Sequence, residues 1–245
     1  MERPGPALPF GSRQLAPPPG RPPRGADVAV FQRLYNALAE LLEPPPGPLL
    51  VVDGAFGPAS ASAARLMQRR FGLTVDGVVG PSTYFALGHG VGAHVTYGGP
   101  AFGSRTLRPG DAGGDVYVLQ NRLAVGGWLQ RAGDGLWAEP TGRALAAFRL
   151  EAGLPPGAHA DGPAAAALQV RTLAGGRALF SGRNGLDVAW AQRRLRRAGR
   201  YSGAVDGIWS PETVAAVRAF QGQAGLLADG IVGPDTFLAL GRAQP

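Results

Sequence analysis

Few side chains in this sequence could carry catalysis or bind a metal ion. It has no cysteine and three histidines, His89, His94 and His159. A zinc hydrolase typically places two histidines four residues apart on a helix, with a glutamate between them. None of the histidines stands in such an arrangement, and His89 and His94 fall in a glycine-rich stretch. We therefore expect no metal site, no cofactor and no enzymatic activity.

Arginine and aromatic side chains form the second group that could do chemistry. All 24 basic residues are arginine and the formal net charge is +7, so the surface should attract polyanions. Aromatic faces can pack against sugar rings, and guanidinium groups bind carboxylates and phosphates. The candidate ligand-binding residues are Arg197, Arg200, Tyr201 and Trp209, with Trp128 and Arg131 in a similar place earlier in the chain. The competing interpretation is that Trp209 fills a core and the arginines form a solvated helix face.

Other partners and locations are less well supported by the sequence. No nucleic-acid-binding motif accompanies the arginines, so we do not expect a nucleic-acid ligand. No apolar run approaches the ~18 residues of a transmembrane helix, which argues against membrane insertion. The N-terminus has no basic region followed by an apolar one, so an ordinary cleaved export signal is not expected.

The aspartates occur mostly in repeated aspartate–glycine pairs. In such a turn the aspartate accepts a hydrogen bond from a backbone N–H two residues on, and glycine takes the positive-φ position. We assign five pairs to structural turns: Asp53 and Gly54, Asp76 and Gly77, Asp134 and Gly135, Asp206 and Gly207, and Asp229 and Gly230. Phe56, Trp137 and Trp209 each follow the first turn of a copy and should fill equivalent core sites.

The turns belong to a tandem repeat. Asp115 and Asp187 are separated by 72 residues, as are Asp134 and Asp206. Such a repeat predicts an array of small modules. The predicted organisation is an N-terminal Pro/Gly-rich segment with one strand-like box at 1–26, modules at 27–88, 115–173 and 187–241, and linkers at 89–114 and 174–186. The middle module is degenerate, because its second turn lacks the Val-Gly-Pro tail.

Each module is expected to contain three short helices. In the last module Val188, Ala191 and Leu195 would form one apolar face. Ser210 would cap the second helix with Pro211 at its first position, and Pro234 would open the third. The predicted fold class is therefore mainly α, a tandem array of three-helix domains joined by short β-hairpins.

The hairpins are predicted from short alternating stretches between the modules. Residues 94–97 and 170–173 alternate and are followed by glycine pairs and by the boxes 103–107 and 175–179. The first box, 11–15, has no upstream strand to pair with. We therefore expect it to be ordered only by pairing within the chain or with a neighbouring subunit. Head-to-tail pairing between subunits would give a homopolymer, and deleting residues 1–24 would then abolish self-association while each module stays folded.

The last copy closely resembles the peptidoglycan-binding type 1 domain family. The resemblance rests on Ala191-Gln192, on Val205 to Trp209, on Phe220-Gln221 and on Asp229 to Gly233. The first copy matches through Phe31-Gln32 and Val52 to Gly57, and the middle one through Leu119-Gln120 and Gly133 to Trp137 before it departs from the pattern. The resemblance implies three-helix domains that hold wall hydrolases on peptidoglycan.

Two functions remain open at this point. The first is a non-catalytic protein that binds peptidoglycan or an anionic wall polymer through tandem modules. The second is a self-assembling structural protein, such as a spore-coat, surface-appendage or filament subunit, that uses the same domains as building blocks. Either function places the protein in the cell envelope, at the spore surface or outside the cell.

Overall fold

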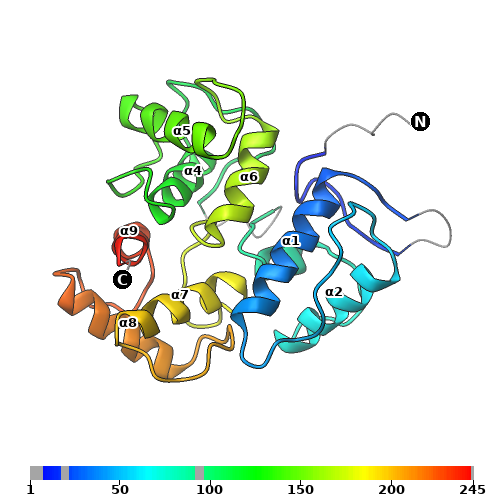
Figure 1. Cartoon of the computed structure of the whole chain (residues 1–245). Helices are drawn as coiled ribbons and strands as arrows, with labels where there is room; N and C mark the ends of the chain where they lie inside the picture. The colour runs from blue at the N-terminus through cyan, green and yellow to red at the C-terminus, as the bar shows by residue number, and fades with distance from the viewer. Residues whose placement is uncertain (1–7, 18–21, 92–96, 244–245) are drawn as a thin grey trace.

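The computed structural model describes residues 8–17, 22–91 and 97–243. Within them the chain is mainly helical, as predicted, and its nine helices form three consecutive groups of three (Figure 1). The first module contains α1 (Ala26–Leu41), α2 (Pro58–Arg70) and α3 (Pro81–Ala86). The middle module contains α4 (Gly114–Val125), α5 (Glu139–Glu151) and α6 (Gly162–Thr172). The last module contains α7 (Leu186–Arg197), α8 (Pro211–Gln223) and α9 (Pro234–Arg242).

Local sequence signals set where the helices of the last module begin. The Ser210 hydroxyl accepts the Thr213 N–H and caps α8, and Pro211 occupies the first turn, where no N–H is needed. Pro234 opens α9 in the same way. Val188, Ala191 and Leu195 are fully buried on α7. The helical pattern predicted for this module is therefore confirmed.

In each module a leucine upstream of the first helix pairs with the module's own second turn. The N–H of Leu15 donates to the Val79 carbonyl at 3.1 Å, and the Val79 N–H donates back at 2.8 Å. Leu107 pairs with Ala160 and Leu179 with Val232 in the same antiparallel manner. All these side chains are buried. The box before each helical group is thus part of the module that follows it.

An ion pair fastens the same box to the first helix. Asp27, Asp115 and Asp187 each lie in the first turn of their helix and bind an arginine of the box. The distances from Nε to the carboxylate oxygen are 2.7 Å for Arg13, 2.6 Å for Arg105 and 2.7 Å for Arg177. The three carboxylates are at most 1% exposed. Both partners are buried only in the Arg177–Asp187 pair, which should therefore be the most sensitive to the loss of either partner.

The predicted β-hairpin linkers are wrong. The described residues contain only isolated β-bridges, and the second half of each supposed hairpin pairs across its own module. Residues 170–172 are the last turn of α6, and Leu173 ends that helix with φ 54°. The stretch 94–97 lies outside the described residues except for Tyr97, which is in a bend. Four alternating residues fit the end of a helix as well as a strand, and only the packing of α6 against α1 and α4 decides between them.

The glycine pair Gly175-Gly176, assigned to a hairpin turn, instead permits close approach between modules. A Cβ on Gly176 would lie 2.0 Å from the carbonyl oxygen of Gly88 in the first module. At the start of α4, a Cβ on Gly114 would lie 2.2 Å from the carbonyl oxygen of Gly98 in the segment that precedes this helix. No side chain fits at such distances, so glycine is required where these backbones meet.

The box at 11–15 does not lack a partner, which corrects the premise of the homopolymer expectation. Leu15 pairs with Val79 of its own module, as its two counterparts do in theirs. Phe10 and Leu15 are buried in the core of the first module. The edge that was expected to recruit a second chain is therefore already satisfied.

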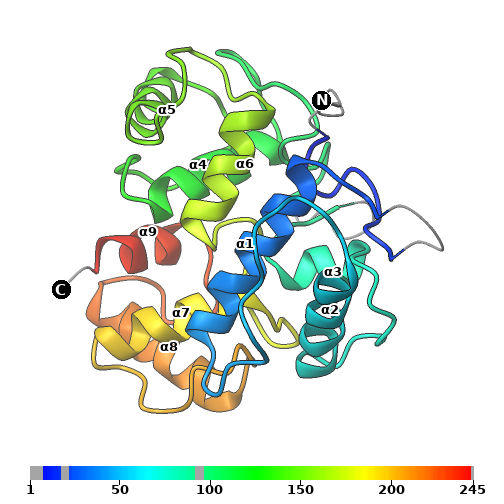
Figure 2. The ribbon, with the colours of Figure 1, turned by 45° about the vertical axis from the view of Figure 1, so that its right-hand side comes forward.

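The three modules pack around a common centre (Figure 2). Helix α1 packs against both α6 and α7, and α4 packs against α9, so each module contacts the other two. After α1, the carboxylate of Glu43 forms an ion pair with Arg196 of α7 at 2.9 Å. Among the described residues, no helix has both the length and the apolar character needed to cross a membrane.

A single buried arginine connects all three modules at this centre. Arg122 of α4 donates to the Gly88 carbonyl of the first module at 2.9 Å. It also donates to the Thr172 hydroxyl at 3.1 Å and to the Ala174 carbonyl, at the start of the last module, at 3.3 Å. Arg122 is 2% exposed, and burial lowers its pKa to about 10. Its charge is solvated by hydroxyl and carbonyl dipoles in place of water.

The aromatic residues that follow the first turns lie inside the modules. Phe56, Trp137 and Trp209 are 0%, 5% and 7% exposed, and each belongs to the core of its own module. The core of the first module also takes in Leu186 and Ala189 of α7. Neighbouring modules therefore share apolar surface, which compensates for the small core that each could form alone.

Candidate functional site

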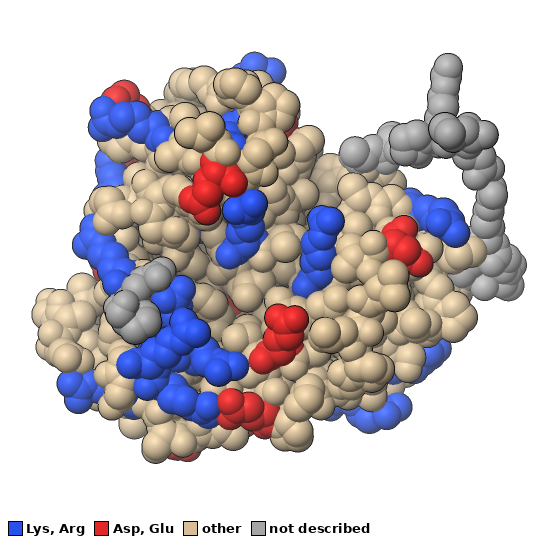
Figure 3. All heavy atoms as spheres, in the orientation of Figure 1, with Lys and Arg blue, Asp and Glu red and all other residues tan. Residues whose placement is uncertain are grey.

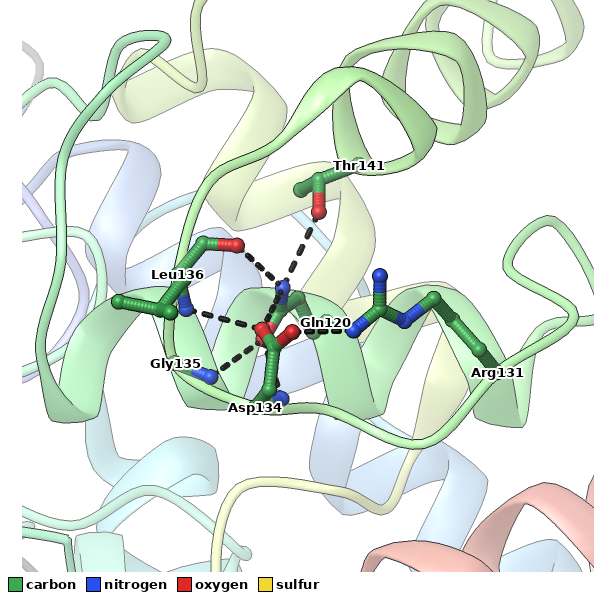
Figure 4. A network of polar contacts seen from close by, with 6 residues as sticks. All are labelled: Gln120, Arg131, Asp134, Gly135, Leu136 and Thr141. Carbon is green, nitrogen blue, oxygen red and sulfur yellow. Dashed lines mark hydrogen bonds and ion pairs between the residues drawn. The ribbon is translucent and has the colours of Figure 1, made fainter.

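A buried glutamine holds each of the assigned aspartate–glycine turns. In the middle module the Gln120 amide donates to Asp134 Oδ1 and to the Leu136 carbonyl, both at 2.9 Å, and to the Thr141 hydroxyl at 3.1 Å (Figure 4). Its Oε1 accepts the N–H groups of Asp134 and Gly135 at 2.9 and 2.8 Å. One side chain thus satisfies five polar groups, including both sides of the turn.

The same clamp recurs at the other assigned turns. Gln32, Gln68, Gln192 and Gln221 each donate to the turn aspartate and accept the glycine N–H. These bonds favour the ionised carboxylate. The amide of Gln32 lowers the pKa of Asp53, and the Leu136 N–H lowers the pKa of Asp134. All five turn glycines have φ between 66° and 77°. The polar groups of the turns are thus engaged in holding the fold.

The second turn of the middle module uses a different clamp. Arg149 takes the place of the glutamine and donates to the carbonyls of Pro155 and His159 at 2.8 and 3.0 Å. It also pairs with Asp161 at 3.1 Å. Arg149 is 3% exposed and Asp161 is 28% exposed, so a partly buried ion pair replaces the neutral amide. The middle copy therefore departs from the repeated pattern because arginine replaces glutamine at its second turn.

A groove opens where the three modules meet. Two cavities of ≈ 290 and ≈ 410 Å³ share Arg171, Thr172, Trp190 and Arg194, so they form one continuous depression, which we call the junction groove. From the first module, Ala37, Glu40 and Leu41 of α1 also line it. The other lining residues are Val125, Gly126, Trp128, Glu151 and Leu173, together with Arg193 and Arg197 of α7. Figure 3 shows this face of the molecule, with basic side chains gathered over α7 beside a central hollow.

Two tryptophans from different modules line the groove. Trp128 is half-buried, packs edge-on against Phe148 with 4.9 Å between ring centroids, and donates its Nε1–H to Glu151 at 2.7 Å. Trp190 of α7 is 6% exposed, packs near Phe237, and carries the guanidinium of Arg194 over its ring at 5.5 Å. Trp190 is buried, so Trp128 is the tryptophan that leaves aromatic surface open to the groove. Aromatic surface flanked by arginines can hold both a sugar ring and an anionic group.

The structure separates the candidate ligand-binding residues. Trp128 and Arg197 line the junction groove. Tyr201 and Trp209 are buried, and the Tyr201 hydroxyl donates to the Ala204 carbonyl at 2.8 Å.

The remaining two candidates are exposed at other places on the surface. Arg200 donates to Gln223 at 2.8 Å. Arg131 pairs with the turn carboxylate of Asp134 (Figure 4). The six candidates therefore do not form one site.

Sequence reasoning missed most of the groove. Trp190 and Arg194 are four residues apart on α7 and so share one helix face, a spacing that could have drawn attention to them. Arg171 was assigned to a strand, and the structure places it on α6. No local signal could show that it faces α7, because that juxtaposition depends on the packing between modules.

The histidines have structural surroundings. His89 is buried between Phe10 and Gln169, and burial lowers its pKa to about 3. His159 lies 3.4 Å from Asp161, and His94 lies outside the described residues. The described part of the chain contains no group of three histidine, cysteine or acidic side chains that could hold a metal ion.

Comparison with known proteins identifies the modules. The first and last, residues 24–87 and 184–240, match the family described as putative peptidoglycan binding domain. These two segments belong to that family, as their motifs predicted. The match does not extend to the middle module. The chain is therefore a protein with peptidoglycan-binding domains.

Similar proteins include two enzymes. The chain is 46% identical over 56 residues to the N-acetylmuramoyl-L-alanine amidase CwlM of Mycobacterium tuberculosis, covering 23% of this chain and 14% of the amidase. It is 44% identical over 41 residues to the zinc D-Ala-D-Ala carboxypeptidase of Streptomyces albus G, covering 17% and 16%. The chain thus spans about a sixth of either relative.

Two solved structures are similar at 39% identity. One is the SleB N-terminal domain, with a TM-score of 0.27, and the match covers 27% of this chain and 92% of that one. The other is a peptidoglycan-binding protein from Clostridioides difficile, with a TM-score of 0.26 and coverage of 27% and 41%.

Proposed function

We propose that this protein binds peptidoglycan without cleaving it, through three modules that act as one unit in the cell wall or envelope. Membership of the first and last modules in the peptidoglycan-binding domain family supports peptidoglycan as the partner. The similar proteins include an N-acetylmuramoyl-L-alanine amidase and a D-Ala-D-Ala carboxypeptidase, whose names describe bonds of the wall polymer.

The junction groove is the observation that carries this proposal. It is lined by helices of all three modules and combines two tryptophans with four arginines. Glycan strands offer sugar rings for aromatic surface and anionic groups for guanidinium donors. A groove built from three modules also gives a reason for the modules to pack in a fixed arrangement and not to move as flexibly linked domains.

The middle module contributes to the proposed site although the family match leaves it out. We treat it as a diverged third copy, because it keeps the Leu107–Ala160 pairing, the Arg105–Asp115 ion pair and the Gln120 clamp. Trp128 and Arg171, which line the groove, both come from it. Loss of the sequence pattern in its second half is consistent with a change in what this copy does.

Non-catalytic binding is proposed because the aspartates of the clamped turns and of the helix starts are engaged in holding the fold. The turn aspartates are held by glutamines, and the aspartates at the helix starts by arginines. Self-assembly is not proposed, since the strand edge on which it rested pairs within its own module.

A co-sedimentation experiment with purified sacculi tests the proposed function. The full chain should pellet with sacculi, and Trp128→Ala should weaken this, since Trp128 lines the groove and is half-buried. Leu150→Ala, a change of an 83% exposed side chain on α5, serves as the control. Incubation with the wall should release no reducing sugar and no free amine. Failure of the full chain to pellet, or release of either product, would refute the proposal.

A further inference from the structure

The junction groove holds more positive charge than its own acidic side chains balance. Four arginines line it against two carboxylates, those of Glu40 and Glu151. Glu151 is engaged by Arg171 at 3.5 Å and by the Trp128 N–H. Within residues 8–17, 22–91 and 97–243, no ion pair joins Arg193, Arg194 or Arg197 to a carboxylate. These three arginines therefore lack a paired carboxylate, although Arg193 lies near enough to Glu43 to add to the lowering of its pKa that the hydrogen bond from Arg196 chiefly causes.

Two guanidinium nitrogens on α7 are buried and have no hydrogen-bond partner among the residues that the structure describes. These are Nε of Arg193 and Nη1 of Arg194. Burial, followed by the neighbouring charge of Arg197, lowers the pKa of Arg194. Buried N–H donors are nearly always paired in folded proteins. An anion bound here would accept hydrogen bonds from these guanidinium groups and would reduce the repulsion between Arg194 and Arg197.

The floor of the groove adds a further cation. Thr172 lines both halves of the groove, and its hydroxyl accepts a hydrogen bond from buried Arg122 at 3.1 Å. Arg122 has no carboxylate partner among the described residues; its bonds go to Thr172 and to the carbonyls of Gly88 and Ala174. A buried charge is only weakly screened by salt. A buried cation thus lies directly behind the Thr172 hydroxyl at the floor of the groove.

From these contacts we infer that the junction groove binds an anionic group of the wall polymer, a phosphate or a carboxylate, through Arg193, Arg194 and Arg197. The planar guanidinium fork matches both anions in geometry. Trp128 offers an adjoining aromatic surface for a sugar next to the anion. The inference rests on the proposed function and specifies the chemistry that the groove recognises.

The test compares one pair of groove arginines with a matched pair outside it. The double variant Arg194→Gln, Arg197→Gln removes two charges from the groove. The control, Arg69→Gln with Arg143→Gln, removes two charges from exposed positions on α2 and α5, outside the groove. Circular dichroism melting establishes that each variant is folded. If the double variant does not fold, Arg197→Gln alone, which changes an exposed side chain, replaces it.

Binding is measured to three preparations of sacculi from a bacterium whose wall carries teichoic acid. The first is untreated, the second has lost its phosphodiesters through hydrofluoric acid, and the third has its peptide carboxylates amidated. The groove variant should bind untreated sacculi at least about tenfold more weakly than the parent or the control, as expected for lost charge-assisted hydrogen bonds. Added salt should weaken the parent more than the groove variant.

The treated sacculi identify the anion. Weaker parent binding after hydrofluoric acid indicates phosphate, and weaker binding after amidation indicates carboxylate. Equal binding of parent and groove variant to untreated sacculi, or parent binding that survives both treatments, would overturn the anion inference and leave wall binding intact. A parent that binds none of the preparations would defeat the proposed function itself, and with it the inference.

Discussion

His89 Nε2 lies 2.8 Å from the main-chain carbonyl oxygen of Phe10. Phe10 precedes the first helix of the first module, and His89 follows its third helix. A carbonyl can only accept, so Nε2 carries the proton, while Nδ1 accepts from the Gln169 amide at 2.9 Å. The ring is therefore neutral, and it joins the first module to α6 of the middle module.

Acidification should destabilise the protein through His89. Burial, followed by the charge of Arg122, lowers the pKa of His89 from 6.5 to about 3. Between pH 6.5 and pH 3 the unfolded chain binds a proton at His89 and the folded chain does not. The free energy of unfolding is therefore highest above pH 6.5 and decreases as the pH falls towards 3. The loss is about 1.4 kcal/mol per pH unit. Urea unfolding of the full chain at several pH values from 7 to 4.5 measures it.

Comparison with two variants isolates this effect from the carboxylates. His89→Gln removes the titrating ring, so its stability should change less over the same pH range than that of the parent. His159→Gln, a change of a side chain that is 39% exposed, should behave as the parent does. Parallel pH profiles for the parent and His89→Gln would show that His89 does not titrate as argued.

Replacing Arg122 by methionine should destabilise the packing of the modules. The substitution leaves the carbonyls of Gly88 and Ala174 without their donor, at a cost of about 2–4 kcal/mol. Urea unfolding should also become less cooperative, because the contact joins three modules. Arg143→Met, on a side chain that is 71% exposed, is the control. A methionine variant as stable as the parent would mean that desolvation of the charge outweighs its hydrogen bonds.

Truncation of Trp209 tests whether it fills the core of the last module. The side chain is 7% exposed and packs among the buried residues of α7, α8 and α9. Trp209→Ala should lower the free energy of unfolding by about 3–5 kcal/mol. Leu227→Ala, at a position that is 80% exposed, should change it by less than about 0.5 kcal/mol. If Trp209→Ala melts as the parent does yet loses binding to sacculi, Trp209 is a ligand contact.

Deletion of residues 1–24 should unfold or loosen the first module. It removes the Leu15–Val79 pairing, the Arg13–Asp27 ion pair and the buried ring of Phe10. The melting temperature of the first module should fall, and hydrogen exchange at Val79 should accelerate. Deletion of residues 1–7 removes none of these contacts and serves as the control. Sedimentation velocity that shows self-association of the parent, lost on the longer deletion, would restore the homopolymer expectation.

The local sequence signals predicted the modules well. Helix starts such as Ser210–Pro211 and turns such as Asp206–Gly207 depend on a few adjacent residues, since a cap or a positive φ is satisfied within one turn of chain. The apolar face of α7 follows from helical periodicity in the same way. The glutamine of each clamp was visible in the motif, but its hydrogen bonds were not, because they span up to 28 residues.

The sequence alone determined the mainly helical class, the repeated turns and the family of the first and last modules. Only the tertiary structure decided that residues 170–172 are helical, that Leu15 pairs with Val79, and that Trp128 and Trp190 line one groove. Short alternating stretches are compatible with either helix or strand, and long-range packing selects between them. The groove depends on contacts between α1, α6 and α7, and no local pattern encodes the relative placement of three modules.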